Sequence, residues 1–243
     1  MKEYAFHVDS ATQTTNVLSY VNEWGHILQV QKEGRKPFRY SSGNFGPIFL
    51  DLERIVGSDI AMRGLIRPLA FKLLNDIGSD FDIVVGIATG GIAPGIELKN
   101  CLNDANTGKR FYFVYERGNK LIGIESPEIK GRKCIIFDDV GNFHSNSIRV
   151  SQLLRTLDFD PVHVAVIVEY SAKRRALLKP YGMNLTSLIE MNVVLDVLRS
   201  NGEYSEKEID SCKEFLGDPY KWMWEHHKLE SVSSMLKRGF RRA

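Results

Sequence analysis

The chain has 243 residues, a length that suits one domain with appendages, and 43% of its residues are hydrophobic. A formal net charge of +2 argues against a general binder of polyanions, and the sequence has no run of about 18 apolar residues that would span a membrane. The cysteines are odd in number, widely spaced and without the rhythm of metal ligands: Cys101, Cys134 and Cys212. We therefore expect a cytoplasmic protein with reduced thiols and no signal peptide.

The N-terminal part of the chain alternates helical and extended patterns. Residues 11–24 carry apolar side chains at helical spacing. Residues 25–50 have the pattern of a hairpin, with two short apolar runs separated by a turn rich in lysine and glycine. The apolar positions of residues 60–77 fall on one face of a helix. These patterns predict a helix, a hairpin and a second helix before the middle of the chain.

The middle of the chain sets the fold class. Short, mostly apolar runs predict strands at residues 82–88, 111–115, 133–137 and 163–168. Helical patterns separate most of them, at residues 92–102, 146–157 and 171–178. Apolar strands that alternate with amphipathic helices indicate a parallel sheet covered on both faces. Because ligands bind beyond the carboxyl ends of such strands, the turns at 88–92 and 140–146 are expected at the same rim.

The last part of the chain has a helical pattern throughout. It predicts three helices, at residues 185–198, 205–216 and 220–236. Ser205 and Glu208 have the spacing of a capping box at the start of the second helix. Trp222 and its apolar neighbours are interpreted as packing residues, against the body of the protein or a second subunit, rather than as a cofactor site.

Residues 134–147 carry the clearest chemical signal. An apolar run ends at two adjacent carboxylates, Asp138 and Asp139, and a polar loop leads to a helical pattern that starts at Ile148. Carboxylates accept hydrogen bonds from vicinal hydroxyls, and a helix start offers free N–H groups to an anion. The stretch therefore predicts a site for a sugar and its phosphate, although either aspartate alone would also serve as a helix cap. The loop lacks most of the glycines that a backbone phosphate cradle needs.

A second loop has those glycines. In the stretch Ala88-Thr89-Gly90-Gly91, the two glycines let the backbone approach an anion closely and tolerate unusual dihedral angles. A plain turn from strand to helix is the alternative interpretation.

Three segments in order, residues 41–52, 85–94 and 135–140, resemble the type I phosphoribosyltransferases, and among them the orotate phosphoribosyltransferases. The resemblance extends from about residue 12 to residue 216. It implies a Rossmann-like, mostly parallel α/β sheet flanked by helices, with an N-terminal hood and a helical C-terminal extension. The implied boundaries are residues 1–59 for the N-terminal helix and hood, 60–200 for the core and 201–243 for the extension.

The resemblance also implies a ligand and a site. The ligand would be phosphoribosyl diphosphate or a nucleotide, bound with Mg²⁺ on the catalytic carboxylates Asp138 and Asp139. The loop for the departing pyrophosphate would be formed by Ala88, Thr89, Gly90 and Gly91. Because residues 141–146 depart from the family's glycine-rich phosphate loop, the phosphate contacts are expected instead from the side chains of Asn142, His144, Ser145, Asn146 and Ser147, and Phe49 is expected to stack on a base. His144 is left open between a protonated cation and a neutral loop residue.

Several charged positions of the family pattern differ here. Arg117 and Lys120 are the candidates for the cations of the catalytic loop, whereas Leu121 and Ile122 stand where the pattern has an acid and a histidine. Tyr170 falls at the position of the arginine that reads the base. Each lost charge-assisted contact costs about 1.5–3 kcal/mol. We therefore expect a reaction other than standard orotate transfer.

Two functions remain open on the sequence alone. One is a phosphoribosyltransferase-like enzyme that performs magnesium-assisted glycosyl transfer or N-glycosidic cleavage. The other is a non-catalytic regulator or scaffold that senses a nucleotide and binds a protein partner through its C-terminal helix. The family implies a homodimer in either case. A metal hydrolase built on Asp138, Asp139 and His144 is a weaker alternative, because it needs more ligands.

Overall fold

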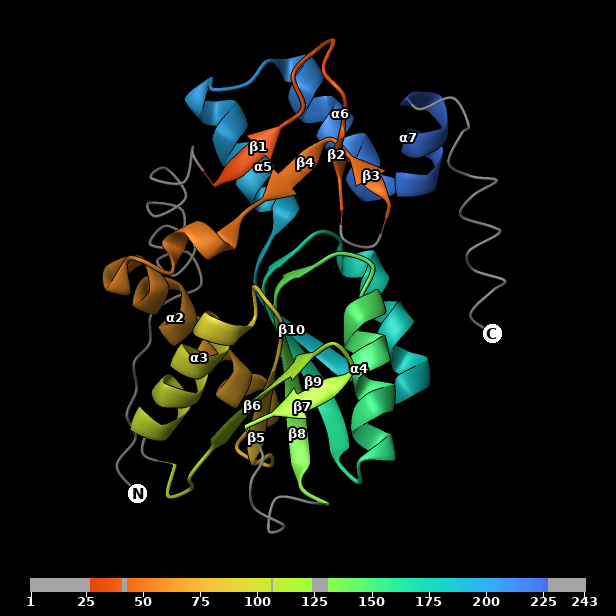
Figure 1. The fold of residues 1–243 in the computed structure, drawn as a ribbon. Coiled ribbons are helices and arrows are strands. Elements are labelled where there is room, and N and C mark those ends of the chain that lie inside the picture. The colour runs from red at the N-terminus through yellow and green to blue at the C-terminus, as the bar shows by residue number, and fades with distance from the viewer. Residues whose placement is uncertain (1–26, 41–42, 106, 124–130, 227–243) are drawn as a thin grey trace. The chain divides into compact units, whose positions relative to one another are not determined.

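The computed structural model describes residues 27–40, 43–105, 107–123 and 131–226, and the chain divides into two compact units (Figure 1). Among the described residues, the first unit contains Ile27 and residues 51–194, and the second contains residues 28–50 and 195–226. The hood segment 28–50 therefore groups with the C-terminal helices. The helix expected at residues 11–24 lies outside the described residues.

A six-stranded sheet forms the first unit, in the order β10-β9-β8-β5-β6-β7. The strands are β5 (Ile83–Ile87), β6 (Tyr112–Arg117), β7 (Lys120–Ile122), β8 (Lys133–Gly141), β9 (Asp160–Glu169) and β10 (Asn184–Glu190). Every neighbouring pair is parallel except β6 and β7, which form an antiparallel hairpin. The mostly parallel sheet predicted from the apolar runs is confirmed.

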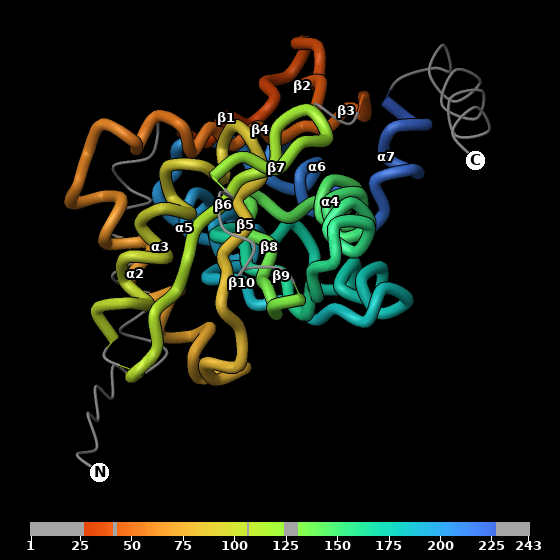
Figure 2. Tube along the Cα trace, turned by 60° about the horizontal axis from the view of Figure 1, so that its bottom comes forward, coloured from red at the N-terminus to blue at the C-terminus, as the bar shows by residue number. Residues whose placement is uncertain are grey.

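Helices cover both faces of this sheet. They are α2 (Asp59–Ile77), α3 (Ile92–Asp104) and α4 (Ser145–Thr156), with the 3-10 helices η1 (Leu52–Ile55) and η3 (Ala172–Tyr181). Figures 1 and 2 show α2 and α3 together on one side of the sheet and α4 on the other. The predicted Rossmann-like layering is therefore confirmed. The segment predicted as a helix at 171–178 is a 3-10 helix.

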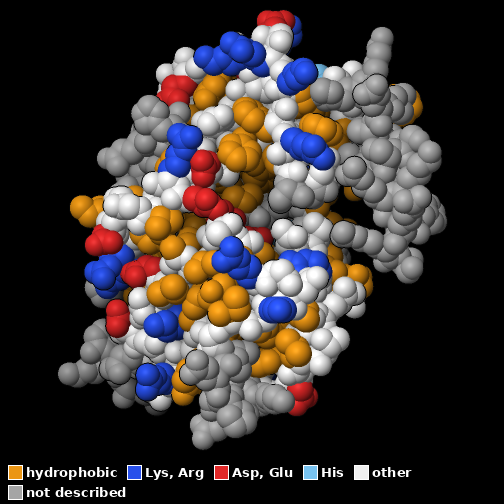
Figure 3. All heavy atoms as spheres, in the orientation of Figure 1, with side chains coloured by type: hydrophobic (Ala, Val, Ile, Leu, Met, Phe, Trp, Pro, Cys, Tyr) orange, Lys and Arg blue, Asp and Glu red, His pale blue; other side chains and the backbone are white. Residues whose placement is uncertain are grey.

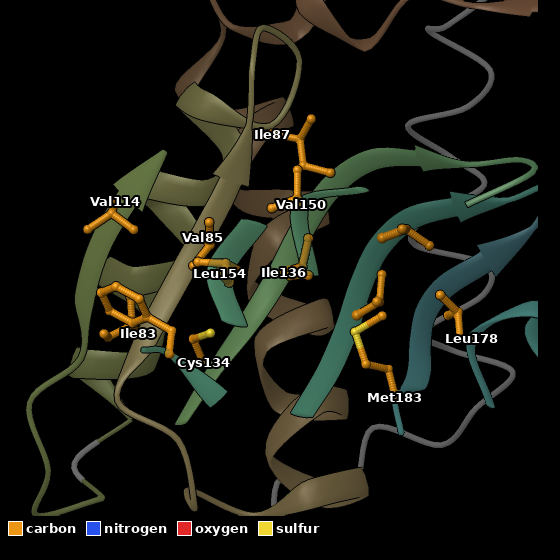
Figure 4. Close-up of a cluster of buried hydrophobic side chains, with 13 residues drawn as sticks. Ile83, Val85, Ile87, Val114, Cys134, Ile136, Val150, Leu154, Leu178 and Met183 are labelled. Carbon is orange, nitrogen blue, oxygen red and sulfur yellow. The ribbon is translucent and has the colours of Figure 1, made fainter. Parts of the chain in front are cut away.

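The apolar core on the α4 side explains the spacing of the strand residues. Alternate side chains of β5, such as Ile83 and Val85, meet Ile136 of β8 and Val150 and Leu154 of α4 in one buried cluster (Figure 4). All of β5 is buried, because this central strand is covered on both faces. This packing fixes which side chains at the carboxyl ends of the strands face α4.

The β6–β7 hairpin was not predicted. Gly118 and Asn119, with φ angles of 60° and 63°, form its two-residue turn. Two central residues with positive φ are typical of the type I′ turn, whose twist matches that of a hairpin. Since β7 is three residues long, its apolar pattern is too short to identify in the sequence.

The helix predicted at residues 185–198 is wrong in its first half. Residues 184–190 form strand β10, and α5 (Met191–Asn201) follows directly. β10 is an edge strand that pairs in parallel with β9 and buries Thr186 and Ser187. Such polar residues do not produce the apolar run by which the other strands were identified, so the leucines nearby fitted a helical pattern.

The second unit has two small antiparallel sheets and two further helices. These elements are β1 (Leu28–Val30) with β4 (Ile48–Leu50), β2 (Phe38–Arg39) with β3 (Phe45–Gly46), α6 (Glu206–Gly217) and α7 (Pro219–His226). The predicted capping box of Ser205 and Glu208 is present. Trp222 packs edge-on against Phe215, with ring centroids 5.5 Å apart, and its indole N–H donates to Ser211 at 2.9 Å. The packing role predicted for Trp222 is confirmed within this unit.

Charged side chains of both signs are mixed over the face shown in Figure 3, in keeping with the small net charge. Among the described helices, none has both the length and the apolarity that a membrane crossing requires.

Candidate active site

The two predicted ligand loops meet at one rim of the first unit. Strands β5 and β8 are neighbours, with Gly86 opposite Phe137, so the loop after β5 and the aspartates of β8 leave the sheet side by side. The contact is close: a Cβ atom on Gly90 would overlap the carboxylate of Asp139. The structure therefore brings together the segment 88–91 and one of the paired carboxylates.

Gly91 has a different role from Gly90. Its N–H donates to the Ile87 carbonyl at 2.8 Å, and a Cβ atom there would lie 2.8 Å from the Phe137 carbonyl oxygen. Gly91 thus lets the start of α3 lie directly against the sheet. The backbone that can approach a ligand is the preceding part of the turn, where Thr89 is exposed and Gly90 is half-buried.

Asp138 and Asp139 point to opposite faces of the sheet, because successive side chains of a strand alternate. Asp138 follows Ile136 on the α4 side, and Asp139 faces Gly90 on the α3 side. One oxygen of Asp138 accepts a hydrogen bond from the Asp139 N–H at 3.1 Å, and Asp139 accepts one from the Val140 N–H at 2.9 Å. Both side chains are half-buried at this rim.

Burial raises the pKa of Asp138 well above its usual value of 3.8, and the neighbouring charge of Asp139 raises it further. Burial also raises the pKa of Asp139. A bound cation would relieve both effects. Two adjacent carboxylates suit Mg²⁺, which binds to one or two carboxylates and takes its other ligands from water and substrate phosphates.

No larger metal cluster occurs in the described part of the chain, where no three His, Cys, Asp or Glu side chains are grouped to hold an ion. Asp138, Asp139 and His144 therefore do not form the hydrolase site considered from the sequence. The two aspartates alone remain as candidate metal ligands.

An ion pair between a buried glutamate and a half-exposed arginine, which the sequence did not reveal, supports the α4 side of this rim. Arg149 of α4 donates to both carboxylate oxygens of Glu116 at 2.9 Å and to the Asn119 side-chain oxygen at 2.6 Å. Glu116 is 2% exposed, and its hydrogen bonds from Arg149 lower its pKa. The pair ties the end of β6 and the hairpin turn to the first turns of α4. Glu116 and Arg149 are 33 residues apart, a separation that no local pattern detects.

Arg117 and Lys120 flank the hairpin turn and stand opposite each other in register. Both side chains are exposed, so either cation can turn toward an anion. Leu121 and Ile122, at the positions of the family's acid and histidine, continue β7. The catalytic roles of Arg117 and Lys120 stay predictions.

The loop between β8 and α4 differs from an open backbone cradle. His144, just before the helix, has a left-handed φ of 54° and is 4% exposed. Burial lowers its pKa to about 4, so the ring is neutral at pH 7 and does not supply the positive charge considered as one option. Of the other predicted phosphate contacts, Ser145 and Asn146 are exposed at the helix start, and Ser147 is buried.

The chain is similar to known enzymes in both sequence and fold. It is 26% identical to the orotate phosphoribosyltransferase of Listeria monocytogenes over 198 residues, which cover 81% of this chain and 93% of that protein. Leishmania donovani UMP synthase has a similar fold, with a TM-score of 0.68 and 20% identity. That match covers 86% of this chain and 43% of the UMP synthase chain.

The chain thus has the type I phosphoribosyltransferase fold. The Mycobacterium tuberculosis orotate phosphoribosyltransferase solved in complex with 5-phospho-alpha-D-ribosyl 1-diphosphate matches with a TM-score of 0.55 and 17% identity, over 74% of this chain and 98% of that one. No protein-family model matches the chain.

Within this phosphoribosyltransferase fold, the end of β9 leads to Tyr170, which was expected at the position of the base-reading arginine. Tyr170 is 3% exposed, and its N–H donates to the Gly141 carbonyl at 2.8 Å. Glu169 beside it is fully buried and accepts hydrogen bonds from Arg175, whose Nε lies 2.8 Å away. Phe49, the predicted stacking residue, belongs to the second unit and lies near Phe38, so its contact with a base stays a prediction.

The loop before α4 also receives a side chain that the sequence did not indicate. Arg174 donates from Nη1 to the Asn142 side-chain oxygen, and its guanidinium lies 4.6 Å from the centre of the Phe143 ring. Arg174 is 8% exposed. Arg174 lies in η3, after the end of β9. Nothing in the local sequence distinguishes it from its neighbours Lys173 and Arg175.

Proposed function

We propose that the protein is a magnesium-dependent phosphoribosyltransferase that uses phosphoribosyl diphosphate as its donor. The observation that carries this proposal is the contact between Gly90 and Asp139, with Asp138 on the other face of the same strand end. A sugar held there by the two carboxylates has its anomeric carbon beside the glycine loop. The M. tuberculosis relative was solved in complex with this donor, which supports the same ligand here.

Each part of the rim then has a chemical task. Asp138 and Asp139 accept hydrogen bonds from the ribose hydroxyls and would hold Mg²⁺, which would supply positive charge beside the diphosphate. The backbone of residues 88–91 binds the departing pyrophosphate. Arg117 and Lys120 lie on the exposed hairpin and stabilise the negative charge that develops on the leaving group.

The acceptor is the finer part of the proposal. The orotate phosphoribosyltransferases among the relatives make orotate the first base to test, but we expect a base without a carboxylate to react faster. At the end of β9, Tyr170 supplies no positive charge, and Arg175 is already paired with Glu169. Neither Tyr170 nor Arg175 would therefore pair with an orotate carboxylate at this strand end.

The test is a coupled assay of pyrophosphate release, with phosphoribosyl diphosphate, Mg²⁺ and a panel of purine and pyrimidine bases that includes orotate. Asp138→Asn and Asp139→Asn should each abolish release and weaken donor binding in calorimetry. Asp80→Asn is the matched control, because Asp80 is an exposed carboxylate that precedes β5 at the other end of the strands. The control should retain wild-type activity.

Other outcomes would change the proposal. Donor binding without turnover of any base over several hours would favour the non-catalytic regulator, and release from nucleotides without an acceptor would indicate N-glycosidic cleavage. No binding of the donor at all would refute the proposal. The homodimer and a protein partner at residues 219–243 stay predictions, tested by light scattering and by pull-down with a chain truncated at residue 218.

A further inference from the structure

The loop at residues 141–147 does not by itself supply the positive charge that the 5-phosphate of the proposed donor requires. Residues 141–147 contain one glycine, and Phe143 and His144 place side chains where a backbone cradle would have none. The neutral ring of His144 brings no charge. A dianionic sugar phosphate bound here needs a cation from another part of the chain.

Three observations place a ligand group at this point. First, α4 begins at Ser145, and its N-cap residue makes no side-chain capping bond, so within the described part of the chain the N-cap side chain does not compete with an anion for the first-turn N–H groups. Second, His144 at the N-cap is 4% exposed, yet neither ring nitrogen has a hydrogen-bond partner among the described residues. Third, the Arg174 guanidinium lies over Phe143 and contacts Asn142, the two residues just before His144.

A buried polar group without a hydrogen-bond partner lowers the stability of the fold. The buried ring of His144 therefore indicates that a bound ligand supplies the partner. A phosphate oxygen is a suitable one, because the ring N–H of a neutral imidazole donates to it. The helix start favours the same negative charge. Arg174 adds a planar, permanently charged donor, which suits phosphate better than an ammonium group does.

We propose that Arg174 binds the 5-phosphate of the donor at the N-terminus of α4, in place of a glycine-rich backbone cradle. The proposal rests on the proposed function for the identity of the donor. It assigns the specificity for a phosphorylated sugar to a residue of η3, outside the loop that follows β8.

A purely structural role is the competing explanation. Arg174 could serve only to hold the loop through its contacts with Asn142 and Phe143. Removing the guanidinium would then disturb the whole rim and weaken every ligand alike. The two explanations differ in which ligands lose affinity, so binding of ligands with and without the 5-phosphate separates them.

The experiment compares ribose 5-phosphate, phosphoribosyl diphosphate and pyrophosphate, each with Mg²⁺, by calorimetry on the full chain. Arg174→Met keeps an apolar stem over Phe143 and removes the charge. It should weaken ribose 5-phosphate and phosphoribosyl diphosphate by about ten- to hundredfold and leave pyrophosphate unchanged. Arg174→Lys should recover part of the loss. Lys173→Met, a change at the exposed neighbour, is the control and should match wild type.

Equal weakening of all three ligands, or of none, would overturn the proposal, and so would wild-type protein that binds pyrophosphate but not ribose 5-phosphate. Thermal melting identifies a variant that fails to fold, in which case Arg174→Lys decides: its affinities must fall for the two phosphorylated sugars and not for pyrophosphate. Failure of the proposed function has a different signature, namely Arg174-dependent binding without transfer to any base.

Discussion

At the scale of single residues, the neighbours Gly90 and Gly91 have different roles, because one contacts a ligand-binding side chain and the other contacts backbone. A methyl group on Gly90 meets the movable carboxylate of Asp139, whereas one on Gly91 meets backbone atoms of Ile87 and Phe137. Gly90→Ala should therefore displace the carboxylate, weaken donor binding at least tenfold and cost less than about 1 kcal/mol of stability.

Gly91→Ala should instead destabilise the fold by about 1–3 kcal/mol, because overpacking against backbone cannot be relieved by a side-chain rotation. Urea denaturation and calorimetric titration of both variants check the pair. Equal loss of stability in both would contradict the assignment.

Buried histidines make the stability of the first unit depend on pH. His163, 3% exposed, lies 3.0 Å from the Thr186 hydroxyl, which itself donates to Asp76, so the ring donates from Nε2. Burial lowers the pKa of His163 to about 4. The unfolded chain then binds protons first as the pH falls, and stability is lost between about pH 6.5 and pH 4.

The free energy of unfolding should fall by up to about 3 kcal/mol through the protonation of His163. His163→Gln should be less stable at pH 7 but should flatten this part of the stability curve, as urea denaturation at several pH values would show. His144 contributes in the same direction, because its pKa is also lowered to about 4. An unchanged slope in the variant would contradict the role of His163.

At the scale of elements, the Glu116–Arg149 pair joins the β6–β7 hairpin to α4. Arg149→Met leaves the buried Glu116 with the Asn119 N–H as a donor but without its cation, and should cost about 1–3 kcal/mol, moderated because the Arg149 side chain is 40% exposed. Glu116→Gln in the same chain should recover part of that cost. A double-mutant cycle by urea denaturation measures the coupling, and additive costs would contradict it.

The elements that could be predicted from the sequence are those with a strong local pattern. We could recognise β5 and β8 by their apolar runs and α2 by its one-sided apolar pattern. These elements also located the rim that carries Asp138 and Asp139. β10 was missed because its buried residues are partly polar. Arg149 and Arg174 were missed because their partners are brought near by the fold and not by sequence spacing.

At the scale of the whole molecule, each compact unit has a core of its own. In the second unit, Phe215 is fully buried and contacts the rings of Tyr40 and Trp222. Phe215→Ala should cost this unit about 3–5 kcal/mol. Hydrogen exchange should show the loss of protection in the amides of 28–40, 43–50 and 195–226, with β5 and β8 retaining theirs. Equal loss in β8 would show that the units unfold as one.

The alternation of side chains along β8 has a consequence for how this protein can change over time. Asp139 belongs with the loop on the α3 side, and Asp138 with the helix start on the α4 side. The sheet thus separates the residues on the α3 side, which would bind the leaving group, from the residues on the α4 side, which would bind the sugar phosphate. Substitutions on one side need not disturb the other. During evolution, an arginine can therefore replace the backbone phosphate cradle on the α4 side of the sheet while the glycine loop on the α3 side is retained.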